Sequence, residues 1–320
     1  MMKIIKTLKG GSLSSTVVLS DGINKFVRKS ISRSNNREYG LVRWQSQIRK
    51  LQLLNQYISE SSVPVIQIGF GDDFYFYDVP YYEHSLNCVE ALLRGDSVSL
   101  IAEKVAILLS KMAAIEYGTA PGSLAVYISE EVRSPLCIAL EFANEGRLPL
   151  NEQELEVFKE AVRKAFTVVD RLLRKVKNLE VRESLTHGNL TLENMLWDAE
   201  SSKILMIDPY AETYCESIMG DVSQLFQSSE SGYEIISNLF ESQDYPIDKY
   251  PIDKIPACFT DFSRQLIKIV ERESWYSEDY LVLFRASQFT RMFPFKLVNS
   301  PRQGVAFMLH GIKLLEEISC

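Results

Sequence analysis

The sequence predicts an α+β protein with two lobes, a small β-rich N-terminal lobe and a larger, mainly helical C-terminal lobe. Short β-type runs separated by turn signals fill roughly the first 80 residues, and beyond them apolar residues recur at helical spacing. The chain has 320 residues, 46% of them hydrophobic, which suffices for about two domains with their own cores. We therefore expect an N-terminal lobe over residues 1–82 and a C-terminal lobe over residues 83–320.

The N-terminal lobe is predicted to run in the order strand, strand, strand, helix, strand, strand. The strands are rich in β-branched and aromatic residues and are expected at Ile4–Leu8, Thr16–Leu19, Lys25–Ile31, Val63–Gly69 and Phe74–Val79. Asp21-Gly22 is a hairpin signal between the second and third strands. The helix is expected at Glu38–Tyr57, where apolar residues follow helical spacing.

After Pro80 the pattern becomes helical, with one short β-type interruption. Helices are expected at Cys88–Leu93, Ser97–Tyr117, Glu152–Val176, Asp221–Phe240, Ile255–Glu273, Ser277–Arg291 and Gly304–Ile318. The interruption consists of two strands, Asn194–Asp198 and Lys203–Ile207, with a turn between them. It predicts a β-hairpin inside the helical lobe.

Composition and charge argue against some classes of function. The net charge is −7 and the pI is near 5.3, which argues against nucleic acid and anionic membrane as partners, because both select basic surfaces. The N-terminal residues lack the apolar stretch of a secretory signal, and no run approaches the length of a membrane span. Five cysteines and three histidines are dispersed along the chain rather than clustered. We expect a cytoplasmic protein without a cysteine- or histidine-based metal site.

The predicted hairpin carries the residues with the clearest chemistry. A polar loop beginning at His187 ends in Asn194, which enters the first strand, and the return strand ends just before Asp208. Because a hairpin brings its two ends together, Asn194 and Asp208 can face one point. An amide oxygen and a carboxylate are the hard ligands that Mg²⁺ prefers. The spacing suggests a magnesium site, although an ordinary hairpin with polar ends would show the same residues.

This stretch resembles the catalytic loop and metal-binding aspartate of the aminoglycoside phosphotransferase and choline kinase family. The family's pattern is His-Gly-Asp, four residues, Asn, a hairpin and then Ile-Asp, and this chain matches it at His187, Gly188, Asn194, Ile207 and Asp208. The resemblance covers residues from about 4 to about 230. It implies a protein-kinase-like fold and transfer of the γ-phosphate of ATP, with Mg²⁺, to a hydroxyl of a small molecule such as a sugar, amino sugar or amino alcohol.

The resemblance also implies roles for the matched residues. Asn194 would bind one magnesium ion, and Asp208 would bridge the metal to the nucleotide phosphates. His187 would pack beneath the catalytic loop and hold its backbone. These implied roles make His187, Asp208 and the residue at position 189 the catalytic candidates.

Further candidates for nucleotide binding lie in the N-terminal lobe. The small residues Gly10, Gly11 and Ser12 resemble a loop that covers the phosphates. Either Arg28 or Lys29 is expected to contact the phosphates, since adjacent strand residues point to opposite faces of a sheet. The spacing favours Lys29, whereas the family's frequent Val-Leu-Arg pattern favours Arg28.

Two more features complete the predicted nucleotide site. Glu38, near the start of the helix, is the expected partner of the phosphate-binding cation. The segment Asp78-Val79-Pro80-Tyr81 lies where the lobes join, so its backbone is expected to bind the adenine.

The chain departs from the family at Asn189, where the pattern has aspartate. An amide has no useful basicity, so Asn189 cannot serve as a general base. Three interpretations follow. The protein is a nucleotide-binding pseudokinase that acts as a scaffold or regulator of a partner protein, or the asparagine is an engineered change, or the enzyme works with Asn189 orienting the acceptor hydroxyl.

Overall fold

The computed structural model describes residues 2–8, 14–33, 37–177, 179–210, 213–236 and 250–318. The chain divides into two compact units, each made of two segments. The first unit comprises Met1–Ala91 and His187–Glu212, and the second comprises Leu92–Thr186 and Thr213–Cys320. This division differs from a single boundary at residue 82, because the hairpin after His187 groups with the N-terminal segment rather than with the helices that flank it in sequence.

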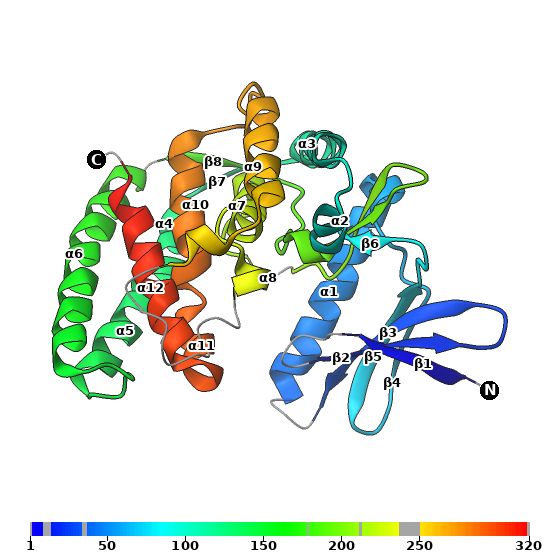
Figure 1. Ribbon diagram of the computed structural model, residues 1–320, viewed down its shortest axis with the longest axis horizontal. Coiled ribbons are helices and arrows are strands. Elements are labelled where there is room, and N and C mark those ends of the chain that lie inside the picture. Colours follow the sequence, from blue (N-terminus) through cyan, green and yellow to red (C-terminus); the bar gives the residue numbers. More distant parts are fainter. Residues whose placement is uncertain are drawn as a thin grey trace. The chain divides into compact units, whose positions relative to one another are not determined.

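The first unit is built on an antiparallel five-stranded sheet with the order β1-β2-β3-β5-β4 (Figure 1). The strands are β1 (Lys3–Leu8), β2 (Ser14–Ser20), β3 (Lys25–Ser32), β4 (Gln67–Phe70) and β5 (Phe74–Pro80). The helix α1 (Arg37–Tyr57) packs on one face of this sheet through a buried apolar cluster that includes Ile48, Leu51, Tyr77 and Val79. The predicted order of strands and helix is confirmed.

The hairpin also belongs to this unit. Strands β9 (Met195–Asp198) and β10 (Lys203–Met206) pair antiparallel, and the short strand β6 (Leu86–Asn87) adds to the edge of β9. Leu205 of β10 joins the same apolar cluster as α1 and β5. The hairpin is therefore anchored to the core under α1, which fixes its ends relative to the sheet.

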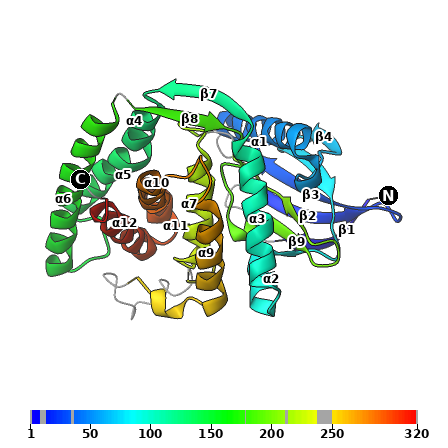
Figure 2. The ribbon, with the colours of Figure 1, turned by 90° about the horizontal axis from the view of Figure 1, so that it is seen from above.

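The second unit is mainly helical. Its longer helices are α3 (Val98–Ala113), α5 (Ser134–Asn144), α6 (Glu152–Val176), α7 (Ile218–Ser229), α9 (Ala257–Val270), α10 (Glu278–Thr290) and α12 (Pro301–Glu316). Shorter helical turns are α4 (Ser123–Ile128), η2 (Ser129–Arg133), α8 (Tyr233–Ile236), η5 (Ile252–Lys254) and α11 (Phe293–Asn299), while α2 (Cys88–Arg94) spans the point where the units divide. Helix α10 packs against both α7 and α12 (Figure 2). Their shared core is aromatic, with Phe284, Phe289 and Phe307 fully buried.

The boundaries of the long helix α6 were predictable because its start carries a capping motif. Asn151 accepts a hydrogen bond from the Glu154 backbone at 2.9 Å, and the Glu154 side chain accepts one from the Asn151 backbone at 2.9 Å. This reciprocal capping box satisfies backbone donors that a helix start leaves open. The predicted range Glu152–Val176 is the observed one.

Elsewhere the helical prediction extends too far. The predicted helix Ser97–Tyr117 ends at Ala113, and Glu116–Pro121 forms strand β7, which pairs antiparallel with β8 (Glu180–Ser184). Gly118 has φ of 107°, a left-handed conformation that a helix cannot continue through. Pairing with a distant strand thus overrides the helical spacing.

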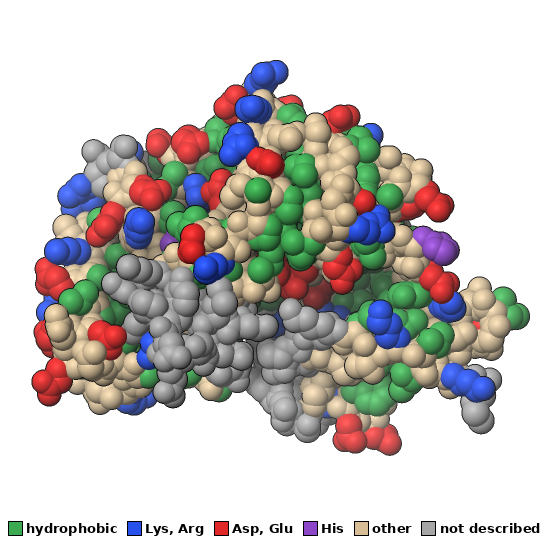
Figure 3. All heavy atoms as spheres, in the orientation of Figure 1, with side chains coloured by type: hydrophobic (Ala, Val, Ile, Leu, Met, Phe, Trp, Pro, Cys, Tyr) green, Lys and Arg blue, Asp and Glu red, His purple; other side chains and the backbone are tan. Residues whose placement is uncertain are grey.

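The surface of the helical unit is mixed in charge. Lysine, arginine, aspartate and glutamate side chains are interspersed over its visible face (Figure 3). In the described part of the chain, no helix combines the length and apolar character needed to cross a bilayer.

His310 on α12 makes the stability of the helical unit sensitive to acid. Its ring stacks on Tyr250 with centroids 4.0 Å apart, and burial, with Arg285 and Lys313 nearby, lowers its pKa to about 3. The unfolded chain binds this proton near pH 6.5, so stability is complete above that pH and falls as the pH drops from 6.5 towards 3. The loss is at most about 1.4 kcal/mol per pH unit for one group.

We expect His310→Gln to lose less unfolding free energy than the wild type between pH 6.5 and pH 4, measured by urea denaturation. His84→Gln, which makes the same change at an exposed position, is the matched control. Parallel curves for the wild type and His310→Gln would show that His310 is not a source of this pH dependence.

Candidate active site

The loop that leads into the hairpin is held by buried backbone contacts. His187 is fully buried, and its Nε2 donates to the carbonyl of Ile207 at 3.0 Å. The Tyr210 backbone N–H donates in turn to the His187 carbonyl at 3.0 Å. Burial lowers the pKa of His187 to about 4, so the imidazole is neutral at physiological pH. Gly188 has φ of 76°, which glycine tolerates better than other residues. These contacts tie the His187 ring and backbone to the segment that follows the hairpin.

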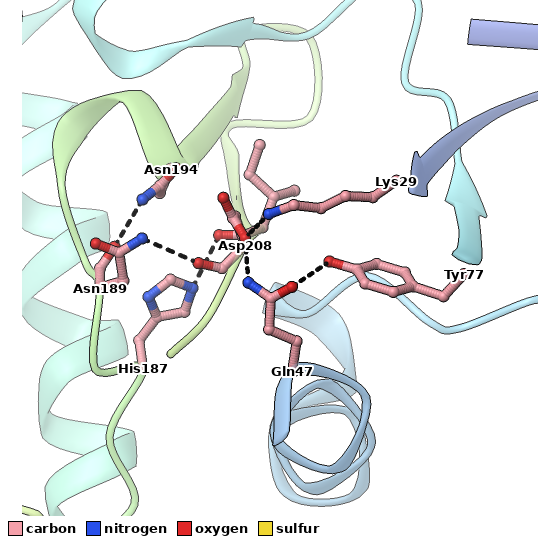
Figure 4. A network of polar contacts seen from close by, with 8 residues as sticks. Lys29, Gln47, Tyr77, His187, Asn189, Asn194 and Asp208 are labelled. Atoms are coloured by element: carbon pink, nitrogen blue, oxygen red, sulfur yellow. Dashed lines mark hydrogen bonds and ion pairs between the residues drawn. The ribbon is translucent and has the colours of Figure 1, made fainter. Parts of the chain in front are cut away.

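Two asparagines connect this loop to the hairpin ends (Figure 4). Asn194 donates through Nδ2 to the carbonyl of Asn189 at 2.8 Å, and its own carbonyl accepts from the Ile207 N–H at 2.9 Å. Asn189 donates through Nδ2 to the carbonyl of Asp208 at 3.2 Å. The amide nitrogens therefore tie the loop together, and the Oδ1 atom of Asn194 is not used in these bonds.

Two side chains contact the same carboxylate oxygen of Asp208. Lys29 of β3 forms an ion pair with Oδ1, and Gln47 of α1 donates to the same Oδ1 at 2.8 Å. The backbone of Asp208 has φ of 55°, a left-handed conformation that aspartate adopts more readily than most residues. Such backbone conformations are a recurrent feature of functional sites.

The neighbours Arg28 and Lys29 point to opposite faces of β3, as the strand period requires. Lys29 is 7% exposed and reaches Asp208; burial lowers its pKa, and the charge of Asp208 opposes that shift. Arg28 instead forms a two-bond ion pair with Asp78 at 2.8 Å for each bond, and its guanidinium lies 3.8 Å from the centroid of Phe76. Of the two candidates, only Lys29 lies at Asp208.

The remaining predicted nucleotide residues are only partly described. Gly10, Gly11 and Ser12 lie outside the described residues, as does the side chain of Glu38. In the predicted adenine segment the carbonyl of Asp78 accepts from Ile66 N–H at 2.8 Å, and Tyr81 N–H donates to the Lys25 carbonyl at 3.3 Å.

Two backbone groups of the adenine segment are thus engaged within the unit. Val79 is 8% exposed and pairs with Val27, and Pro80 ends β5. The roles of these residues in binding a nucleotide stay predictions.

Sequence reasoning missed Gln47 and Tyr77. Tyr77 of β5 lies opposite Lys29 in the strand register and donates to Gln47 Oε1 at 3.5 Å. Gln47 is 1% exposed. A polar residue on the otherwise apolar face of the predicted helix is a signal that could have marked it, since such a residue needs a buried partner.

The donor set fits a hard cation. Lys29 and Gln47 both contact Oδ1 of Asp208, and Asn194 donates through Nδ2, so the bonds described above involve neither the Oδ2 carboxylate oxygen of Asp208 nor the Oδ1 amide oxygen of Asn194. Magnesium is bound in proteins by one or two such groups together with water and phosphate oxygens.

Comparison with known proteins gives likeness in fold alone. No family model matches the chain, and no curated protein matches it. The crystal structure of "Putative fructosamine-3-kinase" from Haemophilus somnus 129PT aligns with a TM-score of 0.58 and 16% identity over 98% of this chain and 92% of that chain. Glucosamine kinase in complex with glucosamine, ADP and inorganic phosphate aligns with a TM-score of 0.54 and 11% identity over 97% of this chain and 93% of that chain.

A further crystal form of glucosamine kinase gives a TM-score of 0.57 and 12% identity over 99% of this chain and 94% of that chain. Alignments that cover nearly all of each chain confirm the predicted fold class, a β-rich N-terminal sheet followed by a mainly helical region, as in these kinases.

Among the cations of β3, replacing the partly buried Arg28 should affect stability more than replacing the exposed Lys25. Arg28→Met leaves Asp78, whose side chain is 2% exposed, without its partner, so we expect a loss of about 3 kcal/mol in the free energy of unfolding. Lys25→Met removes an exposed ion pair with Glu83, which water and salt screen, and should cost much less stability than Arg28→Met. Chemical denaturation measures both, and equal effects would contradict a buried structural role for Arg28.

Proposed function

We propose that the chain is an ATP-dependent phosphotransferase of the aminoglycoside phosphotransferase-like type, which transfers the γ-phosphate to a hydroxyl of a sugar, amino sugar or amino alcohol. The observation that carries this proposal is the convergence of Lys29, Asp208 and Asn194 at the end of the hairpin. One cation and two hard oxygen donors are what phosphoryl transfer needs to position and neutralise a phosphate.

The residues divide the work as follows. Lys29 would bind phosphate oxygens in exchange for part of its contact with Asp208. Magnesium held by Asp208 and Asn194 would neutralise negative charge on the phosphates. Asn189 would orient the acceptor hydroxyl, and the neutral His187 would hold the loop. Because the transition state is loose, positioning and charge neutralisation supply most of the catalysis, and the missing general base lowers the rate without removing nucleotide binding.

An amino sugar or related polyol is the acceptor class that we favour. The solved neighbours are named for kinases acting on fructosamine and glucosamine, and one was solved with glucosamine and ADP. This supports a small-molecule acceptor and a nucleotide donor for the present chain.

A specific contact favours a second candidate function, that of a nucleotide-binding pseudokinase that serves as a scaffold or regulator. The Asn189 amide donates to the Asp208 carbonyl, a bond that an ionised aspartate could not make. The asparagine is thus integrated into the loop, as expected if the site has been kept for binding rather than for turnover.

The first test compares the wild type with Asn189→Asp. We expect the melting temperature of both to rise with ATP and Mg²⁺ but not with ATP and EDTA. Asn189→Asp should lose about 1–3 kcal/mol of stability, because two oxygens would face each other where a hydrogen bond was. If the protein is a phosphotransferase, the variant should release ADP about 10²–10⁴-fold faster with glucosamine or another amino sugar, as a restored general base predicts.

The outcomes separate the candidates. ADP release by the wild type that depends on an amino sugar supports the working enzyme. Nucleotide binding by both proteins with turnover by neither supports the pseudokinase. Absence of any magnesium-dependent response in both proteins would refute nucleotide binding at this site.

A further inference from the structure

Gln47 makes a second contact to Asp208 that the proposed reaction does not explain by itself. The side chain comes from α1, is 1% exposed and donates through Nε2 to Asp208 Oδ1 at 2.8 Å (Figure 4). Asp208 belongs to the segment after β10, and Tyr77, the other partner of Gln47, belongs to β5. One side chain therefore links the helix, the sheet and the end of the hairpin within a single unit.

The orientation of the Gln47 amide is set by Tyr77. The Tyr77 hydroxyl donates to Gln47 Oε1 at 3.5 Å, which leaves the amide nitrogen directed at Asp208. Tyr77 is 3% exposed, and burial raises its pKa well above the usual value, so the hydroxyl keeps its proton. The chain of donors therefore runs in one direction, from tyrosine through glutamine to the carboxylate.

We propose that Gln47 is a positioning residue for Asp208: its amide, oriented by Tyr77, holds Oδ1 beside Lys29 so that Oδ2 is presented to the phosphate-bound cation. This inference rests on the proposed function, because it assigns Asp208 to a nucleotide-bound magnesium ion. Partners that orient a metal-binding carboxylate typically contribute 10- to 100-fold to metal affinity.

The positioning role depends on the side chain of residue 47 being uncharged. A glutamate at this position would place a second carboxylate within hydrogen-bond distance of Oδ1, where like charges repel and both compete for Lys29. An amide donates a hydrogen bond to Asp208 without adding charge. Gln47 can thus hold the carboxylate while leaving the Lys29–Asp208 pair intact.

The test measures how much Mg²⁺ is needed for half of the ADP-induced rise in melting temperature. Gln47→Leu is close in size to glutamine and cannot donate, so it should need about tenfold more Mg²⁺. In EDTA the variant, like the wild type, should show no ADP-induced rise in melting temperature. Gln45→Leu, an exposed position on the same helix, is the matched control and should behave like the wild type.

A second pair of variants separates positioning from simple packing. Tyr77→Phe keeps the ring but removes the hydroxyl, so it should raise the Mg²⁺ requirement in the same direction by a smaller factor. In the Gln47→Leu background, Tyr77→Phe should add nothing, because it acts through the amide. Should Gln47→Leu fail to fold, Tyr77→Phe and Gln47→Glu give the same readout, and Gln47→Glu should also raise the Mg²⁺ requirement.

Failure of the inference and failure of the proposed function look different. If the wild type shows no magnesium-dependent response to ADP, the proposed function falls and this inference falls with it. If the wild type responds and the Gln47 and Tyr77 variants titrate like Gln45→Leu, the site binds nucleotide but Gln47 does not position Asp208. Additive effects of Gln47→Leu and Tyr77→Phe would overturn the relay through the amide.

Discussion

Met195 pairs with Met206 across the β9–β10 hairpin, and one residue further out the Asn194 carbonyl accepts from the Ile207 N–H at 2.9 Å. This register decides where Asp208 lies relative to the loop that starts at His187. A slip of one residue would turn every side chain of β10 to the other face, since the strand period is two. The contact of Leu205 with the core under α1 prevents that slip, so apolar packing on one side of the hairpin fixes the polar chemistry at its end.

Two neutral amides help to hold Asp208. Lys29 pairs with its carboxylate, while Gln47 and Asn189 hydrogen-bond its carboxylate and its carbonyl without adding charge. A buried charge is tolerated when it is paired and hydrogen-bonded, whereas each additional carboxylate would need its own counter-ion. Amides supply directional bonds without that requirement. The Asp208 carboxylate is thus held by one ion pair and one amide hydrogen bond.

Local signals predicted most of this unit and part of its site. The spacing between His187 and Asp208 indicated the hairpin, and strand alternation separated Arg28 from Lys29, but the choice between them depended on Asp78, which lies far along the chain. Gln47 carried only a weak signal, because a polar residue within an apolar pattern does not reveal its partner. Pairing of β7 with β8 could not be predicted either, since Gly118 and long-range hydrogen bonds outweigh the helical spacing of that segment.

Position 189 distinguishes the two parts of the proposed chemistry, binding of the phosphate and transfer of a proton. Lys29, Asp208 and Asn194 concern the phosphate, and none of them needs a base at position 189 to keep its contacts. The Asn189 amide nitrogen donates to the Asp208 carbonyl, so its side chain helps to shape the proposed phosphate site even though it cannot take a proton. An aspartate there would gain basicity and lose that bond. At position 189 an amide stabilises the loop, whereas a carboxylate would allow proton transfer. The asparagine of this chain supplies the stabilising hydrogen bond.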